Sequence, residues 1–191
     1  MSTREAIIDS LAGTSVTSFK GRRPTATDID TLEKELAIIA ATVKTSIFPE
    51  GEKHGHLCNV ISNESYGAII GDPNFELEEP DVPEAYNPNI LAHMGDIQRK
   101  TMESEWDKHK QHYQAYLGVQ EVLRKRIVEA VDPQFLRELY NEYTGYSQHA
   151  ARDIIDHIRT KVKLTTIPRR PKCEIRSTSN GIKVKTSPAT L

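Results

Sequence analysis

Apolar residues recur at helical spacing in two stretches of the chain. The first stripe has intervals of three and four residues and consists of Ile29, Leu32, Leu36, Ile39 and Val43. Such a stripe lies on one face of an amphipathic helix, and that face has to be buried against another element. We therefore predict a helix over residues 28–44, with Thr27 as its N-cap and Phe48-Pro49 beyond its end.

The second stretch predicts three more helices between residues 87 and 163. A long apolar stripe follows Asn87-Pro88 and ends at Asp132-Pro133. In both dipeptides a good N-cap residue precedes a proline that suits the first helical position, so each favours the start of a helix. A short helix over residues 133–141 is followed by a turn at Gly145-Tyr146, after which Ser147 is placed to cap the third helix.

Large apolar side chains of this second stretch are expected to hold the helices to one another and to further copies of the chain. Their helical and turn spacing favours packing over the alternative, in which tyrosines stack on nucleic-acid bases. The predicted anchors are Trp106, Tyr113, Tyr116, Leu123, Ile127, Phe135, Leu136, Tyr146 and Ile155.

Between the two stretches the pattern changes to short and irregular elements. Residues 56–61 alternate in character, which indicates a short strand or extended segment. Ser62 is placed to cap a short helix that reaches Ile70. Residues 72–88 contain four prolines and six acidic residues, which precludes a regular helix and predicts an extended acidic connector.

The two ends of the chain lack such periodicity. Residues 1–24 are predicted to form a flexible arm with a weak helical turn, and residues 164–191 a disordered basic tail. Residues 25–86 then comprise a helix, the extended segment and the acidic connector, and residues 87–163 form the main helical unit. The predicted fold class is therefore mainly α, a helical bundle with a short extended segment and disordered termini.

The charges of the chain are unevenly placed. The net charge is −2 at pH 7, but residues 163–191 hold seven basic residues and one acid, a net +6, so residues 1–162 carry −8. A basic segment of this kind can release counterions from RNA and bind it without sequence preference, or it can simply increase solubility. The RNA-binding candidates are Arg169, Arg170, Lys172, Arg176, Lys183 and Lys185.

Composition also bears on location. Hydrophobic residues make up 37% of the chain, and no apolar run is long enough to cross a bilayer or to serve as a signal peptide, so we expect no membrane contact. The two cysteines, Cys58 and Cys173, lie in unlike contexts and imply no disulfide framework. Reduced thiols are the rule in the cytosol, so a cytoplasmic location is expected.

The sharpest metal-like pattern is His54-x-His56-x-Cys58. In an extended segment the three side chains share one face, and two histidines with a cysteine can bind zinc. The sequence shows no fourth ligand at a familiar spacing, so we favour a turn whose histidines bond to backbone groups; a zinc-stabilised module or zinc enzyme is the alternative. Phosphate-binding glycine loops and hydrolase motifs are also missing, so we expect no enzymatic activity, no cofactor and no small-molecule substrate.

Two runs of residues resemble one protein family. The first is Gly51-x-x-His54-Gly55-His56-Leu57-x-x-Val60, followed by Tyr66, Phe75, Pro80 and Pro83. The second comprises Tyr113-x-x-Tyr116, Leu123, Ile127, Ala130-Val-Asp-Pro133-x-Phe135-Leu136, Leu139, Thr144-Gly145-Tyr146 and Asp156-His157-Ile158. Together they cover about residues 47–160 and resemble the Gag-like capsid proteins of Copia-type LTR retrotransposons, especially the copies in algal and diatom-like genomes.

This resemblance implies a helical capsid protein that self-associates into a shell around the RNA of its element and has no enzymatic activity. The chain departs from the family after His157, where further capsid helices are expected, and it lacks the CCHC zinc knuckle that usually binds RNA. The resemblance therefore implies a copy truncated at its C-terminus, in which the basic tail substitutes for the knuckle. A monomeric RNA- or protein-binding adaptor derived from a retrotransposon gene is the alternative to a shell-forming protein.

Overall fold

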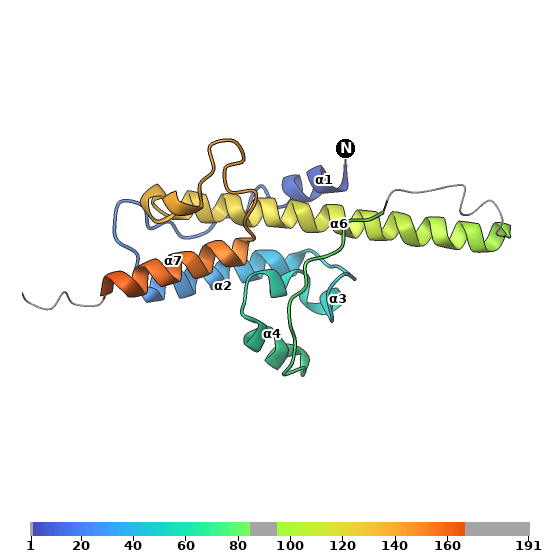
Figure 1. The fold of residues 1–191 in the computed structure, drawn as a ribbon, viewed down its shortest axis with the longest axis horizontal. Coiled ribbons are helices and arrows are strands. Elements are labelled where there is room, and N and C mark those ends of the chain that lie inside the picture. Colours follow the sequence, from blue (N-terminus) through green and yellow to red (C-terminus); the bar gives the residue numbers. More distant parts are fainter. Residues whose placement is uncertain (1, 85–94, 167–191) are drawn as a thin grey trace, which may run out of the picture.

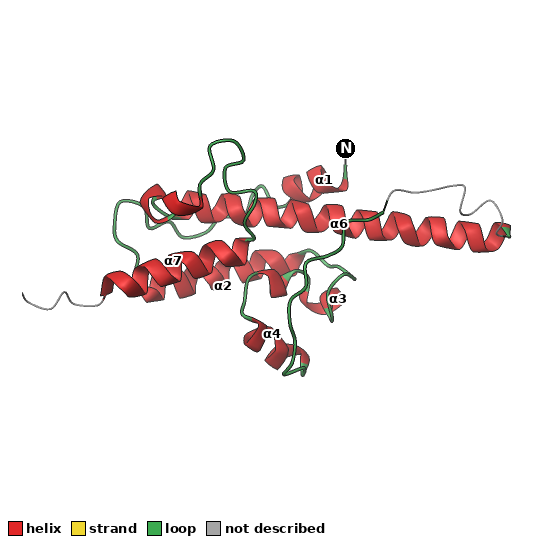
Figure 2. Cartoon of the chain, viewed as in Figure 1, coloured by secondary structure: helices red, strands yellow, loops and turns green. Residues whose placement is uncertain are grey.

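The fold is built from helices that differ greatly in length (Figure 1). The computed structural model describes residues 2–84 and 95–166. The α-helices are α1 (Thr3–Ser10), α2 (Ala26–Thr42), α3 (Gly51–His54), α4 (Asn63–Ile70), α6 (Asp96–Ala130) and α7 (Ala151–Thr166). Three short 3-10 helices complete the described elements: η1 (Leu57–Asn59), η2 (Pro133–Phe135) and η3 (Arg137–Leu139). These ranges contain no β-strand, so the predicted mainly-α fold is confirmed (Figure 2).

Helix α6 is the longest element, with 35 residues, and the other long helices pack against it. Helix α1 lies along one side of α6, whereas α2 and α7 lie together on the opposite side (Figure 1). One hydrophobic core joins all four helices, with fully buried residues such as Leu36, Leu123 and Ile158. The helix predicted near residues 28–44 and the main helical unit therefore share a single core.

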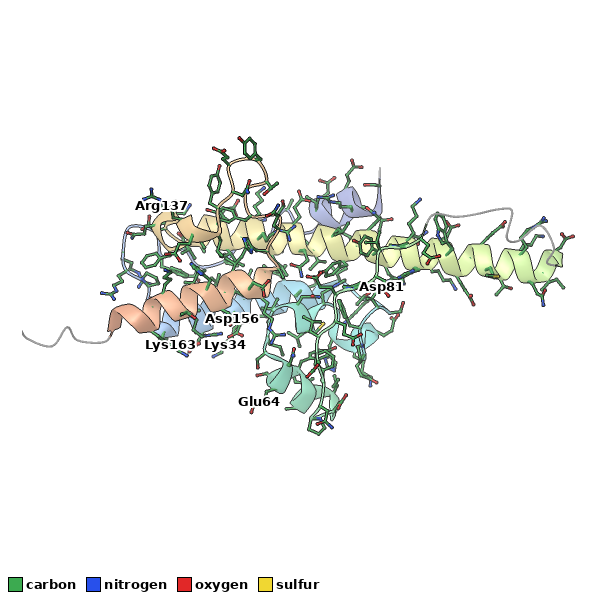
Figure 3. The ribbon with its side chains drawn as sticks, in the orientation of Figure 1. Lys34, Glu64, Asp81, Arg137, Asp156 and Lys163 are labelled. Atoms are coloured by element: carbon green, nitrogen blue, oxygen red, sulfur yellow. The ribbon has the colours of Figure 1, made fainter. Side chains whose placement is uncertain are left out.

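Charged side chains lie mostly on the outside of this core (Figure 3), with Arg126 as a buried exception. Those labelled in the figure, Lys34, Glu64, Asp81, Arg137, Asp156 and Lys163, are all exposed. No helix within residues 2–84 and 95–166 is long and apolar enough to cross a lipid bilayer.

The start of α2 shows how a local signal sets a helix boundary. The hydroxyl of Thr25 accepts a hydrogen bond from the backbone N–H of Asp28, and the Asp28 carboxylate accepts one from the N–H of Thr25. This reciprocal capping box makes Thr25 the N-cap, so the prediction of Thr27 was wrong by two residues. Arg22 also donates two hydrogen bonds to Asp28, and these hold the pKa of that carboxyl well below its usual range.

Residues 1–24 do not form the predicted flexible arm within the part that the structure describes. Helix α1 begins with a capping box between Ser2 and Glu5, and Leu11 and Phe19 are buried in the main core. The guanidinium of Arg126 donates hydrogen bonds to the carbonyl oxygens of Leu11 and Ala12, at 3.3 and 2.7 Å. Apolar burial and satisfied backbone groups thus fix a segment whose composition suggested mobility.

Three further predictions of local structure need correction. Residues 56–61 form η1 and a turn instead of an extended segment, and the predicted helix 133–141 is divided into η2 and η3. Asp132 and Pro133 do take the predicted N-cap and first helical positions, but of η2, and the Asp132 carboxylate makes no capping bond because it accepts the N–H of Gly21. Ser147 does not cap the third helix as predicted, because α7 begins only at Ala151, whose N–H donates to the Gln120 side-chain oxygen.

Other boundaries follow the sequence or lie outside the described residues. The Ser62 hydroxyl accepts the N–H of Ser65, so the predicted cap of α4 is confirmed. No helix is found in residues 72–84, as the prolines require. The start signal Asn87-Pro88 and the basic tail beyond Thr166 lie outside the described residues.

Candidate assembly surfaces

The glycine–histidine motif packs closely against the C-terminal end of α2. A Cβ atom at Gly51 would lie 2.5 Å from the carbonyl oxygen of Thr45. At Gly55, where φ is +59°, a Cβ atom would lie 2.6 to 2.8 Å from three carbonyl oxygens of residues 40–43. The N–H of His56 then donates to the carbonyl oxygen of Ala40 at 3.0 Å. These close approaches require glycine at both positions and show that the motif is a packing element.

His56 is buried in an aromatic environment and does not meet a metal-binding partner. Its ring lies edge-on to Phe48, with 5.7 Å between the ring centroids, and is stacked on Tyr116, with 6.3 Å between the centroids. Neither ring nitrogen has a hydrogen-bond partner. Burial lowers the pKa of His56 to about 4, with a smaller contribution from the charge of His112, and burial raises the pKa of the Cys58 thiol to about 12. Within residues 2–84 and 95–166, no three His, Cys, Asp or Glu side chains form a group that could hold a metal, so His54, His56 and Cys58 do not converge.

The predicted anchors divide into two groups according to their burial. Five are buried and belong to the two hydrophobic clusters of the fold: Tyr116, Leu123, Ile127, Leu136 and Ile155. The others are half-buried: Trp106, Tyr113, Phe135 and Tyr146. The buried group packs the chain against itself, so contacts with another copy have to use different side chains.

Trp106 lies on the part of α6 outside the packed core. Its indole N–H donates to the carbonyl oxygen of Glu84 at 2.8 Å, and the ammonium of Lys110 lies 4.8 Å from the ring centroid. Every buried residue of α6 lies in residues 113–130, which we call the body half. Residues 96–112, which we call the free half, project beyond the other helices (Figure 1).

The free half of α6 exposes apolar side chains of a kind that is usually buried in a folded protein. The side chain of Ile97 is 84% exposed and that of Met102 is 43% exposed. A shallow groove of about 390 Å³ runs along this half and is lined by Ile97, Lys100, Thr101, Ser104, Glu105 and Lys108. A long helix without core contacts needs either local charge pairs or a partner, so this surface is our first candidate contact.

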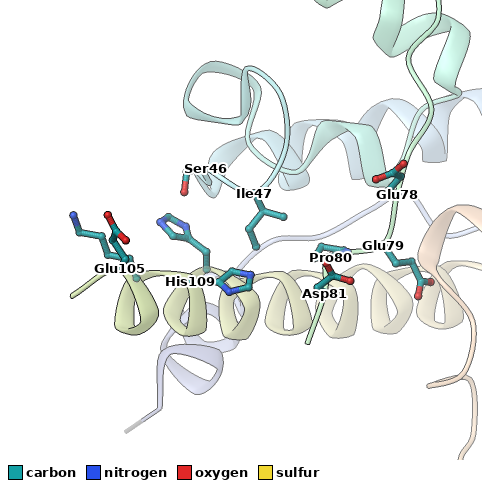
Figure 4. A pocket seen from close by; sticks show the side chains of 10 residues that line it. Ser46, Ile47, Glu78, Glu79, Pro80, Asp81, Glu105 and His109 are labelled. Atoms are coloured by element: carbon teal, nitrogen blue, oxygen red, sulfur yellow. The ribbon is translucent and has the colours of Figure 1, made fainter. Parts of the chain in front are cut away.

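A second groove, of about 470 Å³, lies where the free half meets the rest of the chain (Figure 4). The α6 side of the groove carries Glu105, Lys108, His109 and His112, and the opposite walls consist of Ser46, Ile47 and the acidic connector from Glu78 to Asp81. The groove carries charges of both signs. The acidic side chains of the connector can therefore attract the lysine and histidine side chains of the helix.

The second candidate contact is a tight loop that holds a tyrosine outward. Asn141 and Gly145 exchange backbone hydrogen bonds across the loop, and the Asn141 side-chain oxygen accepts the N–H groups of Tyr143 and Thr144. This geometry leaves the Tyr143 side chain 87% exposed. The ring centroids of Tyr140 and Tyr146 lie 5.4 Å apart, and the two rings line a groove of about 380 Å³ together with Pro133, Gln134 and Arg137.

Rigid, exposed aromatic groups are typical of protein contact sites because they bury much area with little loss of entropy. The turn at Gly145-Tyr146 was predicted, but the exposure of Tyr143 was not. An Asn four residues before a Gly was the signal that could have indicated it.

Comparison with known proteins identifies no relative of this chain. No protein-family model, curated protein or solved structure matches it. The predicted RNA-binding residues Arg169, Arg170, Lys172, Arg176, Lys183 and Lys185 lie outside the described residues.

Proposed function

We propose that this protein is a non-enzymatic, Gag-like structural protein that self-associates through helix faces. The observation that supports the proposal most strongly is the free half of α6, a projecting helix with Ile97 and Met102 exposed. Exposed apolar groups on a preformed helix lower the entropy cost of association, because the helix is already ordered before it meets a partner. The resemblance of residues 47–160 to Copia-type Gag proteins is consistent with this role.

RNA is the second component of the proposal and rests on charge. Residues 1–162 carry a net −8, which disfavours contact between the helical body and a polyanion, whereas residues 163–191 carry +6. Binding through the basic tail alone would be sequence-independent and weak for a single chain. Assembly of many copies would place many tails near one RNA molecule and so raise the overall affinity.

The test is a concentration series measured by light scattering and sedimentation velocity, with and without single-stranded RNA. We expect discrete large particles that form at lower protein concentration when RNA is present. High salt should weaken this effect of RNA. A matched variant with Arg169, Arg170 and Lys172 changed to Gln should lose most of the RNA effect but still associate without RNA. A chain that stays monomeric at every concentration, with or without RNA, would overturn the structural role.

Such a monomer that still binds RNA would point instead to the adaptor function. Metal analysis of the purified protein tests the zinc alternative independently. Zinc well below one ion per chain would agree with the separate positions of His54, His56 and Cys58.

A further inference from the structure

One face of the free half of α6 carries a seam of residues spaced for pairing with another helix. Ile97, Thr101, Ser104 and Lys108 follow at intervals of four, three and four residues, and all four are exposed. This alternation is the spacing at which a helix packs along a second helix. The central residues, Thr101 and Ser104, are small, so two helix axes can approach closely there.

The flanks of this seam carry charges that complement a second copy of the same helix. Lys100 and Asp107 lie on one flank, and Gln98 and Glu105 lie on the other. Two copies related by a two-fold axis perpendicular to both helices bring identical flanks together. When Thr101 lies opposite Ser104 of the second copy, Lys100 falls within about 3 Å, measured along the axis, of Asp107 of that copy. The symmetry forms this charge pair twice, and Gln98 meets Glu105 on the other flank.

We infer that this seam is the contact between two copies of the chain, which pair antiparallel through the free halves of α6. The inference deepens the proposed function and rests on it, since it names the surface through which self-association begins. The partner is a second copy, because the face complements itself in both charge and spacing. Neither Lys100 nor Asp107 forms an ion pair within the described residues, so both are available to the second copy.

The antiparallel direction follows from the position of the rest of the molecule. The seam ends at the groove of Figure 4, because Lys108, its last residue, lines that groove together with Ser46 and Ile47. A parallel partner would bring two bodies to the same end of the pair and onto the same side of the helices, where they would collide. Antiparallel pairing places the bodies at opposite ends.

The contact is small and polar, so a single pair is weak. Each copy contributes one large apolar side chain to the seam, Ile97, and the paired stretch spans about 17 Å of helix. Stable complexes usually bury about 1,200–2,000 Å² of surface in total. Two helices paired over so short a stretch bury less than this. A weak two-fold contact suits a protein whose assemblies are held by many contacts at once.

The experiment is a charge-reversal cycle that distinguishes the two directions. Lys100→Glu or Asp107→Lys alone creates two like-charge contacts, and we expect either change to raise the dissociation constant of the dimer roughly three- to thirty-fold. The double variant Lys100→Glu/Asp107→Lys should return it to within about threefold of the wild-type value. The double variant Lys100→Glu/Glu105→Lys should stay weak, because those residues meet only in a parallel pair.

Sedimentation velocity over a concentration series at low salt measures these constants, and circular dichroism verifies that each variant keeps its helices. Lys34→Glu, on the exposed side of α2, is the matched control and should leave the constant unchanged. Rescue by Glu105→Lys instead of Asp107→Lys would overturn the antiparallel geometry. Association that no variant alters would overturn the seam but leave the proposed function standing. A wild-type chain that remains monomeric would overturn both.

Discussion

The two halves of α6 belong to one continuous helix but are stabilised in different ways. In the body half, residues 113–130, buried side chains such as Val119, Leu123 and Ile127 contact α1, α2 and α7. In the free half, residues 96–112, no side chain is buried. The interactions of that half include the ion pair of Asp96 with Arg99, which contributes little at an exposed site, and the hydrogen bond from the Trp106 indole to the Glu84 carbonyl oxygen. The comparison indicates that the free half is less stable than the body half, because it lacks the buried contacts that stabilise most helices in proteins.

The largest difference between the two halves should appear when apolar side chains are shortened. Leu123→Ala removes a fully buried side chain and should lower the free energy of unfolding by about 2–5 kcal/mol. Ile97→Ala changes a side chain that is mostly in water and should cost less than about 0.5 kcal/mol. Urea unfolding of dilute protein measures both. Equal losses at the two sites would show that the free half is buried in solution.

A second difference concerns pH, because the body half packs against a buried histidine, His56, whose ring stacks on Tyr116, whereas no side chain of the free half is buried. Burial lowers the pKa of His56 to about 4, so the unfolded chain, with its ordinary pKa near 6.5, takes up a proton at higher pH than the folded chain does. Stability from this group is therefore complete above pH 6.5 and is lost as the pH falls toward 4. Between pH 7 and pH 5 the loss should be about 2 kcal/mol.

Urea unfolding at several pH values tests this expectation. His56→Leu should flatten the pH dependence in that range. His109→Gln, on the exposed free half, is the matched control and should leave the dependence unchanged. A wild-type stability that does not vary between pH 7 and pH 5 would contradict the burial of the His56 ring.

The third difference depends on how closely α1 approaches the body half. A Cβ atom at Gly118 would lie 3.0 Å from the carbonyl oxygen of Arg4 and 3.2 Å from the Ile7 side chain. Gly118→Val should therefore displace α1 and cost about 1–3 kcal/mol, despite the better helix propensity of valine. Gln111→Val, at an exposed position of the free half, should cost less than about 0.5 kcal/mol. Faster proteolysis near α1 in the first variant alone would locate the effect.

Periodicity in the sequence predicted the long helices and much of the core, because burial of one helix face leaves a regular trace. The stripes of α2 and of the body half, with Tyr116 and Leu123 as anchors, lie in the core as predicted. The packing of α1 was missed, although Ser2 and Glu5 form a capping box and Ile7 and Leu11 share a face. Eight residues are too few for periodicity to outweigh a polar composition.

Other features depend on tertiary contacts that leave no periodic pattern. Residues 58–60 are all buried, irrespective of alternation, because the segment is enclosed by α2 and the Phe48–Tyr116 cluster. The apparent strand pattern was therefore misleading. The seam of α6 was not predicted as a separate surface, since spacing alone does not show which part of a periodic stripe remains uncovered.

The smallest expected effect separates local from global unfolding. Ser104→Gly lowers helix propensity by about 0.5 kcal/mol. If the free half frays independently of the core, the change should speed amide hydrogen exchange in residues 96–112 by roughly twofold and leave the urea midpoint of dilute protein unchanged. Ala115→Gly, at a buried position of the body half, should lower the free energy of unfolding by about 1 kcal/mol or more and so shift the urea midpoint to a lower concentration.

Protein concentration turns this pair of variants into a test of the contact itself. Association through the free half would slow exchange in residues 96–112 as concentration rises, because a bound partner stabilises only the helix that it covers. Exchange in the body half should not respond, since its amides are already protected by the core. Concentration-independent exchange in a chain shown to associate would place the contact elsewhere, and the Tyr143 loop would then be the next candidate surface, to be examined by Tyr143→Ala.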